Sequence, residues 1–167
     1  VDFFVTPTVN IADLPNGVRD GINYNSNTSV TLVLRAPGKS TAQVIGDFNN
    51  WAQTNDGFMN KTPDGKYFWI TLNNLTAGQQ YGFQYLVDNT IKIGDPYAEL
   101  VLDPFNDQYI NETTVNPNTY PNLKPYPTGL TTGQISVLQT NAPTYTFTAT
   151  NYIRPNKKAL VIYEFLL

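Results

Sequence analysis

Few residue types in this chain could carry chemistry. The 167-residue sequence contains no histidine and no cysteine, and charged residues make up 14% of it. This excludes imidazole and thiolate metal sites, Ser-His-Asp triads and Cys-His dyads. Thirteen carboxylates and a set of aromatic side chains remain, two of which are tryptophans. We therefore consider two kinds of chemistry: carboxylate catalysis or metal binding, and stacking of a ligand on an aromatic ring.

The aspartates stand mostly beside residues that form turns. Those next to Gly, Asn or Pro are Asp47, Asp56, Asp64, Asp88, Asp95, Asp103 and Asp107. Aspartate side chains bond the backbone within turns, so turn capping is the predicted role of each. Asp103, Asn106 and Asp107 offer oxygens to Ca²⁺, but no glycine-turned loop with a closing glutamate accompanies them. We predict no metal site and no cofactor.

The aromatic candidate lies at the end of the stretch from Val44 to Trp51, VIGDFNNW. Its first residues favour a strand, Gly46 allows a bulge, and Asn49 and Asn50 tolerate left-handed turn geometry. The turn leaves Trp51 at a corner. There the ring either packs inward as part of the core or lies on the surface as a platform for the apolar face of a ligand. The sequence leaves both alternatives open.

Short segments rich in strand-forming residues surround this corner. They cover residues 20–24, 30–35, 42–48, 66–75, 81–88 and 91–93. Asp88-Asn89 is a two-residue hairpin signal between the last two. Strands at a spacing of about ten residues, joined by turn residues, predict an all-β, immunoglobulin-like β-sandwich over residues 17–100, after an N-terminal arm of residues 1–16.

The sequence changes character in its last third. Residues 101–158 are rich in proline and tyrosine, and prolines at this density are expected to prevent regular β-ladders. We predict a connector that packs over a neighbouring surface. Residues 159–167, ALVIYEFLL, lose the alternation of a half-exposed strand, which is typical of a strand buried on both faces. Glu164 within that run would need a partner from another domain.

Charge and hydropathy exclude two classes of partner. Ten Lys and Arg against 13 Asp and Glu give a net charge of −3 without a basic run, so we predict no nucleic-acid partner. No apolar run of about 18 residues is present, so we predict no membrane segment in this chain. The Asn-, Thr- and Tyr-rich composition is a weak hint of an extracytoplasmic location, which stays open.

Three motifs together carry a family resemblance. GDFNNW at 46–51, the tyrosine-rich strand ending in Val87-Asp88, and Asp95-Pro96 resemble carbohydrate-binding module family 48. The run from Asp95 to Ile110, then Arg154-Pro155 and LVIYEFLL, resembles the passage that joins this module to the (β/α)8 barrel of the α-amylase family, glycoside hydrolase family 13. The resemblance implies a piece of a longer protein, in which residues 159–167 are the first strand of the catalytic barrel.

The resemblance also implies glycan-binding residues. The family's sugar-binding members use a tryptophan after the corner, a lysine in the strand that precedes the VDG hairpin, and a second tryptophan just past that hairpin. In this chain these positions are Trp51, Gln84 and Ile91, and Asn49 belongs to the corner. Isoleucine lacks a ring that could stack under a sugar, whereas glutamine can still bond a hydroxyl. Weak binding of an α-glucan polysaccharide and simple packing against the barrel therefore both remain open.

We consider two functional hypotheses. In the first, the chain is the non-catalytic N-terminal module of an α-amylase-type glycosidase or glucan branching enzyme. Its partners would be the C-terminal catalytic barrel of the same polypeptide and, weakly, an α-glucan such as starch or glycogen. In the alternative, it is a free-standing adhesion or scaffold β-sandwich without a sugar role. The apolar run at residues 159–167 favours the first hypothesis.

Overall fold

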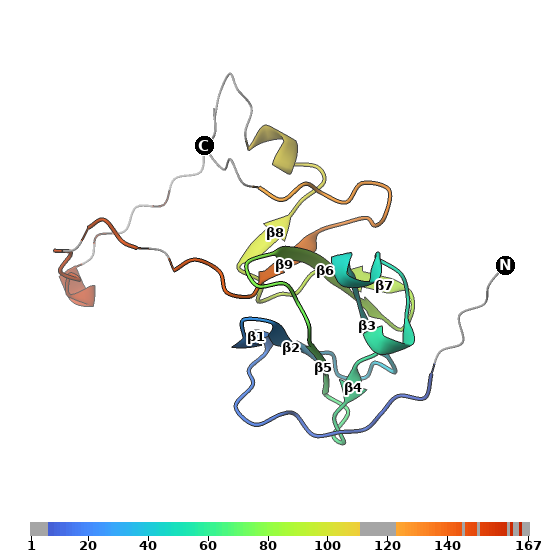
Figure 1. Ribbon diagram of the computed structural model, residues 1–167. Coiled ribbons are helices and arrows are strands. Elements are labelled where there is room, and N and C mark those ends of the chain that lie inside the picture. The colour runs from blue at the N-terminus through green and yellow to red at the C-terminus, as the bar shows by residue number, and fades with distance from the viewer. Residues whose placement is uncertain are drawn as a thin grey trace.

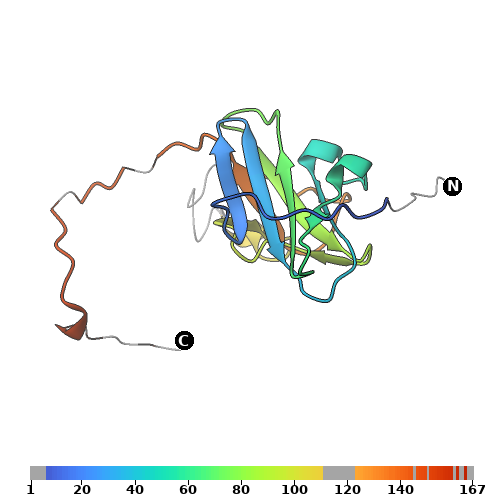
Figure 2. The same cartoon turned by 90° about the horizontal axis from the view of Figure 1, so that it is seen from below.

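A computed structural model describes residues 7–110, 123–144, 146–149, 151–159, 161 and 164. They form two antiparallel sheets that make two layers (Figures 1 and 2). The strands are β1 (Gly21–Ser26), β2 (Ser29–Arg35), β3 (Ala42–Gly46), β4 (Asn60–Lys61), β5 (Tyr67–Leu72), β6 (Gln80–Val87), β7 (Ile91–Ile93), β8 (Leu100–Leu102) and β9 (Ile135–Gln139). Short 3₁₀ turns are η1 (Asp47–Asn49), η2 (Asn55–Gly57), η3 (Asp107–Tyr109) and η4 (Lys157–Ala159).

The two sheets differ in how much of the chain they use. The first sheet has the order β1-β2-β5-β4, from the first half of the chain. The second has the order β3-β6-β9-β8, and β7 also pairs with β6. The predicted immunoglobulin-like β-sandwich is confirmed. The long strand β6 is central to the second sheet, since β3 lies along one of its edges and β9 and β7 share the other.

Alternation along the strands fills the space between the sheets. The inner core takes Leu32 and Phe68 from the first sheet and Val44, Phe83 and Tyr85 from the second. The rings of Phe83 and Tyr85 meet edge to face, with centroids 5.6 Å apart. This is the preferred geometry for aromatic pairs, so two neighbouring positions on one face of β6 fix each other's orientation.

The second sheet is also buried on its opposite face. A second cluster there, called the outer cluster below, consists of Ile45, Trp51, Leu86, Leu102, Ile135 and Val137. Leu123 and Tyr126, from the predicted connector, pack against it. Both faces of β6 are therefore covered, although an antiparallel sheet in a sandwich commonly leaves one face in water.

One sequence-based expectation was wrong. The segment expected to lack ladders supplies β8 and β9, and β9 pairs with β6 from Gln80↔Gln139 to Phe83↔Ser136. Regular pairing is allowed because residues 135–139 contain no proline; the prolines lie on either side. The sheet therefore extends to residue 139, beyond the expected domain boundary at residue 100. Residues 111–122 of the predicted connector lie outside the described residues.

The predicted turn after β6 is present, and residues 7–16 of the predicted arm are among the described residues. Asp88 and Asn89 have φ of 48° and 56°, the left-handed values that a two-residue turn needs. Because Val87 pairs with Ile91, the connection between β6 and β7 also includes Thr90. Residues 7–16 run beside β4, where the Ala12 N–H donates to the Lys61 carbonyl at 3.0 Å. The Trp69 Nε1–H donates to the Ala12 carbonyl at 3.2 Å. The arm thus covers β5 and explains why both faces of that strand carry bulky residues.

Only Ala159, Val161 and Glu164 of the predicted barrel strand are among the described residues. Ala159 closes η4, and all three are exposed. The preceding described residues, from Asn141 to Lys158, are exposed as well and lead away from the sheets (Figure 1). The assignment of residues 159–167 to a barrel therefore stays a prediction.

A buried carboxylic residue, Asp95, links strands β6 and β9 of the second sheet. Asp95 is 4% exposed, and its Oδ2 accepts the Tyr85 hydroxyl at 2.7 Å. Its backbone N–H donates to the Ser136 hydroxyl at 2.6 Å. Burial raises the pKa of Asp95, outweighing the hydrogen bonds from the Tyr97 N–H and the Tyr85 hydroxyl, which lower it. Burial, with the nearby Asp95 charge, also raises the pKa of Tyr85 well above its usual value.

The raised pKa of Asp95 predicts a pH-dependent stability. A carboxyl whose folded pKa is raised favours the fold below its unfolded pKa of about 3.9, and that contribution is lost as pH rises through the folded pKa. Asn in this position stays neutral, so Asp95→Asn should gain stability relative to the unmodified chain between pH 4 and pH 7. Urea unfolding at both pH values measures this difference. The exposed control Asp56→Asn should show no such trend, and a flat difference for Asp95→Asn would contradict the assignment.

Candidate functional site

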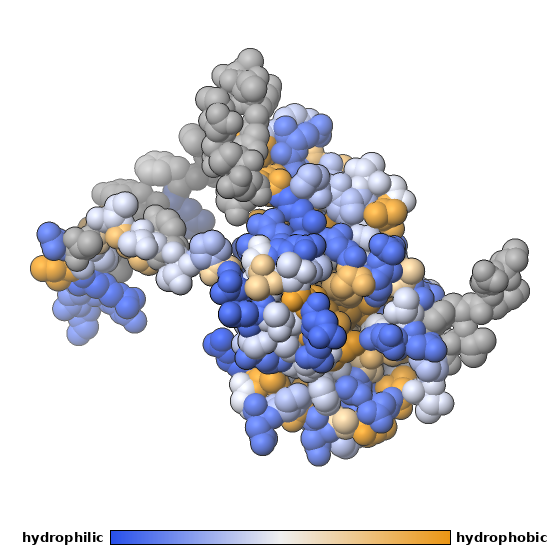
Figure 3. All heavy atoms as spheres, viewed as in Figure 1, coloured by the Kyte–Doolittle hydropathy of each residue, from blue (hydrophilic) through white to orange (hydrophobic). Residues whose placement is uncertain are grey.

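The described residues on the face seen in Figure 3 form no continuous apolar area that would mark a site. Hydrophobic residues are scattered among hydrophilic ones on the face shown in Figure 3. No helix among the described residues has the length and apolar character needed to cross a membrane. A candidate site is therefore sought in the geometry of individual residues, starting at the corner that ends in Trp51.

The corner is closed by the Asn49 side chain. Its Oδ1 accepts the Gly46 N–H at 2.8 Å, and its Nδ2 donates to the Val44 carbonyl at 2.9 Å. Asn50 and Trp51 follow with φ of 52° and 60°. Left-handed geometry is unusual for tryptophan, and the Asn49 bonds hold the turn that imposes it. The Asn49 amide is thus engaged within the protein.

Trp51 packs inward. Its side chain is 7% exposed and belongs to the outer cluster. Its ring lies over Gly82, where a Cβ would come within 3.3 Å of Cζ2, so a residue without a side chain leaves room for the indole. Of the two alternatives left open by the sequence, core packing is confirmed.

The Asp47 carboxylate connects three segments. Oδ1 accepts the Trp51 Nε1–H at 3.1 Å, and Oδ2 accepts the Gly82 N–H at 2.7 Å. Lys124 Nζ forms an ion pair with Oδ2 at 3.0 Å. The predicted turn-capping role of Asp47 is therefore wrong, because its partners come from the corner, β6 and the connector. The sequence hint was the spacing of four residues between Asp47 and Trp51 across a turn.

Gln84 holds the connector against the sheet. The side chain is 1% exposed, and Nε2 donates to the carbonyls of Thr132 and Gln134, both at 2.9 Å. Its Oε1 accepts the Thr131 hydroxyl. Both donors and the acceptor of this amide are used inside the protein. Gln84 thus fastens residues 131–134 rather than presenting an amide to solvent.

Ile91 lies away from these residues. It is 42% exposed and pairs with Val87, whose side chain points into the inner core. Trp51 contacts Gly82, five residues earlier on β6, a separation of about 16 Å along the strand. Directly paired residues share a face, so Lys92, paired with Leu86, is the β7 residue on the Gln84 face.

The structure therefore does not bring the four predicted residues onto one exposed surface. Trp51 and Gln84 share the outer face of β6 but are buried, Asn49 is engaged at the corner, and Ile91 is exposed elsewhere. Sugar binding by these residues stays a prediction. For Trp51 or Gln84 to touch a ligand directly, residues 123–134 would have to be displaced.

An open groove lies on the same face as Gln84, beside the connector. It has a volume of about 540 Å³, within the usual range for ligand pockets. We name it the Lys92 groove; its lining includes Lys92, Phe105, Tyr126, Leu130, Thr131 and Thr132. Phe105 is 70% exposed, and Lys92 Nζ lies 3.3 Å from the Thr131 hydroxyl that also bonds Gln84. Sequence reasoning missed this groove because its walls come from the segment interpreted as a mere connector.

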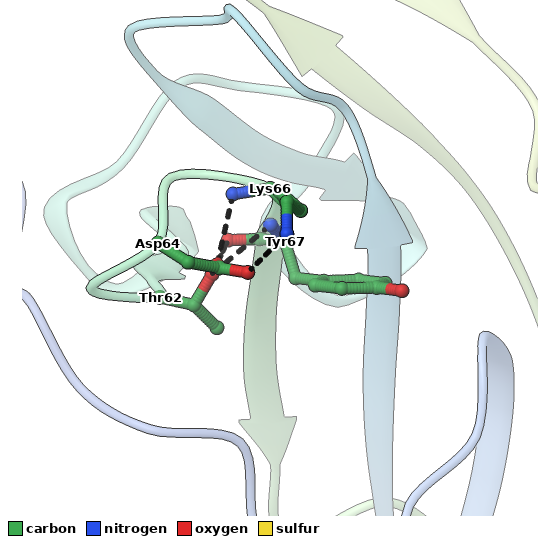
Figure 4. Close-up of polar contacts among 4 residues, drawn as sticks. All are labelled: Thr62, Asp64, Lys66 and Tyr67. Carbon is green, nitrogen blue, oxygen red and sulfur yellow. Dashed lines mark hydrogen bonds and ion pairs between the residues drawn. The ribbon is translucent and has the colours of Figure 1, made fainter.

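Turn capping is confirmed for Asp64. Its Oδ1 accepts the Thr62 hydroxyl at 2.6 Å and the Lys66 N–H at 3.1 Å (Figure 4). Lys66 Nζ lies 3.3 Å from Oδ2. The bond from Thr62, followed by that from the Lys66 backbone, lowers the pKa of Asp64. This carboxylate stabilises the turn between β4 and β5.

The side-chain oxygens considered as Ca²⁺ ligands instead accept hydrogen bonds from residues of the same segment. Asp103 Oδ1 accepts the Phe105 N–H and Oδ2 accepts the Asn106 amide, both at 2.8 Å. Asp107 Oδ2 accepts the Asp103 N–H at 2.9 Å. The Phe105 bond, then the Asn106 bond, lowers the pKa of Asp103. Within the described ranges, no group of three or more Asp or Glu residues is arranged to hold a metal ion.

Comparison with known proteins relates part of the chain to glucan-branching enzymes. The 1,4-alpha-glucan branching enzyme GlgB of Clostridium perfringens is 32% identical over 80 residues, which are 46% of this chain and 12% of the enzyme. The branching enzyme GlgB 2 of C. perfringens strain 13 is 34% identical over 80 residues, with the same shares. No family model matches the chain.

Two solved structures match part of the chain at low identity and with low TM-scores. The catalytic module of the glycogen-degrading pneumococcal virulence factor SpuA matches with a TM-score of 0.40 and 22% identity, over 50% of this chain and 13% of that one. The Group B Streptococcus pullulanase SAP matches with a TM-score of 0.42 and 21% identity, over 57% and 13%.

The sequence resemblance to enzymes of α-glucan metabolism is thus confirmed. None of these matches names the family 48 binding module. The chain spans about an eighth of the length of the curated relatives it matches. What those whole enzymes do is therefore carried to this chain only as a proposal.

The burial of Trp51 predicts how its substitutions behave. Trp51→Ala should lower the free energy of unfolding by about 3 to 5 kcal/mol, because it leaves a cavity in the outer cluster. Trp51→Phe keeps most of the ring but loses the bond to Asp47, so about 1 to 2 kcal/mol is expected. Urea unfolding measures both. Tyr109→Ala, at a 58% exposed position, should change stability by less than about 0.5 kcal/mol. A Trp51→Ala loss as small as this control would contradict the core assignment.

Proposed function

We propose that the chain is a non-catalytic module of an enzyme that acts on α-glucans, either a branching enzyme or an α-amylase-type hydrolase. The observation that carries the proposal is the match over 80 residues to 1,4-alpha-glucan branching enzymes. The family resemblance rests on the GDFNNW corner, the tyrosine-rich strand ending in Val87-Asp88, and Asp95-Pro96. The alternative of a free-standing adhesion or scaffold sandwich gains nothing from this match.

The engagement of the carboxylates supports a non-catalytic role. Glycoside hydrolysis uses two carboxyl groups, about 5 to 9.5 Å apart, that flank the scissile bond, and one must be protonated. Among the described residues, Asp95 is the carboxyl with a raised pKa, but it is 4% exposed and bonded to Tyr85. Asp64 and Asp103 have lowered pKa values and cap turns. We assign catalysis to the barrel of the same polypeptide, against which this module packs.

We further propose that the module binds α-glucan weakly in the Lys92 groove. Phe105 offers an exposed ring to the apolar face of a glucose unit, and Lys92 and Thr132 offer hydrogen bonds to hydroxyls. Gln84 bonds the Thr131 hydroxyl and the Thr132 carbonyl, so it holds one wall of this groove, whereas Trp51 does not line it. One stacking ring contributes about 0.5 to 1.5 kcal/mol beyond area burial, and association entropy offsets part of the gain. The expected dissociation constant is therefore in the millimolar range.

Titration with maltoheptaose, followed by NMR of the ¹⁵N-labelled chain, tests this binding. Phe105→Ala should weaken binding by about tenfold, because it removes the stacking ring. Trp51→Phe should leave binding unchanged, because Trp51 does not line the groove and a ring is kept in the outer cluster. The matched control Tyr97→Ala removes a ring that is 60% exposed outside the groove. Binding that tolerates Phe105→Ala but is lost in Trp51→Phe would instead favour Trp51 as the glycan-binding residue, as the family resemblance implies.

The non-catalytic role predicts that the isolated chain releases no reducing sugar from starch, glycogen or maltooligosaccharides. The physical reason is that an accessible pair of carboxyl groups in two protonation states is required. Reducing-end assays at increasing protein concentration measure this. Release that survives repurification and disappears on substitution of an aspartate of this chain would overturn the proposed role.

A further inference from the structure

A second groove lies beside the corner. It has a volume of about 680 Å³ and opens between the corner, η2 and the turn that joins β5 to β6. We name it the corner groove; it is lined by Phe48, Asn49, Asn50, Thr54, Asp56, Gly57 and residues 71–75. None of these residues lines the Lys92 groove. Of the residues that the resemblance implies for glycan binding, Asn49 lines this groove, but its amide is engaged at the corner. The comparisons assign no function to the groove.

The rim of the corner groove carries polar groups without a partner. The side chains of Asn50, Asp56 and Asn74 are exposed, and none makes a hydrogen bond within the part of the chain that the structure describes. Their neighbours do: Asn49 closes the corner, and Asn73 Oδ1 accepts the Ser29 hydroxyl at 2.8 Å. Two amides and a carboxylate thus face solvent from backbone that is held in place.

The backbone conformations keep these amides in position. Asn50 and Asn74 have φ of 52° and 60°, so each stands at a fixed left-handed turn. The side chain of Thr71 is held by the neighbouring strand β2, since its hydroxyl lies 2.8 Å from that of the paired residue Thr31. A ligand therefore meets a largely preformed rim, which lowers the entropy lost on binding.

The floor of the groove is apolar. Phe48 and Leu72 are half-buried and pack against the inner core, and Leu75 is 5% exposed. Amide and carboxylate groups above an apolar floor suit a ligand with hydroxyls at its edges and C–H groups on its faces. No lysine or arginine lines the groove, so an anionic ligand would find no positive charge there.

We propose that the corner groove binds a neutral saccharide chain, independently of the Lys92 groove. Asn50 and Asn74 bond its hydroxyls as donors and acceptors, Asp56 accepts from them, and Phe48 and Leu72 contact a sugar face. This inference rests on the proposed function only in the choice of an α-1,4-glucan as the first probe.

The side-chain amides of Asn50 and Asn74 report directly on the groove. Titrating the ¹⁵N-labelled chain with maltoheptaose should shift both amide signals in a saturable way, whereas glucose 6-phosphate at equal concentration should shift them less. The double variant Asn50→Gly/Asn74→Gly keeps the left-handed backbone and removes both amides. Followed by the backbone N–H signals of residues 71–73, which line the same groove and remain in the variant, binding at the corner should weaken by about tenfold, as expected for the loss of two hydrogen bonds.

Controls separate this site from the Lys92 groove. Asn141→Gly is matched, because Asn141 also has a positive φ, of 53°, and lies outside the corner groove. It and Phe105→Ala should leave the shifts at Asn50 and Asn74 unchanged. Shifts confined to the surroundings of Phe105 would overturn the corner site and leave the proposed function standing. Shifts at Asn50 and Asn74 alone would support the corner site and remove the Lys92 groove. An unshifted spectrum with maltoheptaose would overturn both.

Discussion

The second sheet depends on one carboxylate. Asp47 accepts hydrogen bonds from the indole N–H of Trp51 and the backbone N–H of Gly82, and it forms an ion pair with Lys124. A partly buried carboxylate requires such partners, and charge-assisted bonds are the stronger ones. Because the three donors come from the corner, β6 and the connector, satisfying one carboxylate draws these segments together. The indole is turned inward by the same bond, over the glycine that leaves room for it.

The inward tryptophan determines where ligands can bind. Trp51 belongs to the outer cluster, against which residues of the connector pack. Gln84 holds the connector in place through hydrogen bonds from its side-chain amide to two backbone carbonyls. Two of the positions that resemble a sugar-binding surface, Trp51 and Gln84, are thus used for packing. Exposed polar and aromatic groups line the two grooves instead. Lys92 and Phe105 line the Lys92 groove, and Asn50 and Asn74 line the corner groove.

Local patterns predicted most strands and the fold class. The alternation in residues 30–35 and the turn residues Asp88 and Asn89 act over a few positions, so the sequence reveals them directly. The role of Ile135–Gln139 depends on pairing with β6, more than fifty residues earlier, and nothing local indicates it. Prolines nearby suggested an irregular connector, although none falls within the strand. The functions of Asp47 and Gln84 were missed for the same reason, since their partners are distant in sequence.

The placement of β9 makes the sandwich and its predicted connector one cooperative unit. Ile135 and Val137 belong to the outer cluster and Leu138 to the inner core, and each is at most 4% exposed. Burying an aliphatic side chain contributes about 1.5 to 3 kcal/mol, which for three is comparable to the whole stability of a small domain. Without β9, one edge of β6 from Gln80 to Phe83 would lose its hydrogen bonds and the inner core one of its walls. The boundary of this module therefore follows from the pairing of β6, and the change in composition near residue 100 does not mark it.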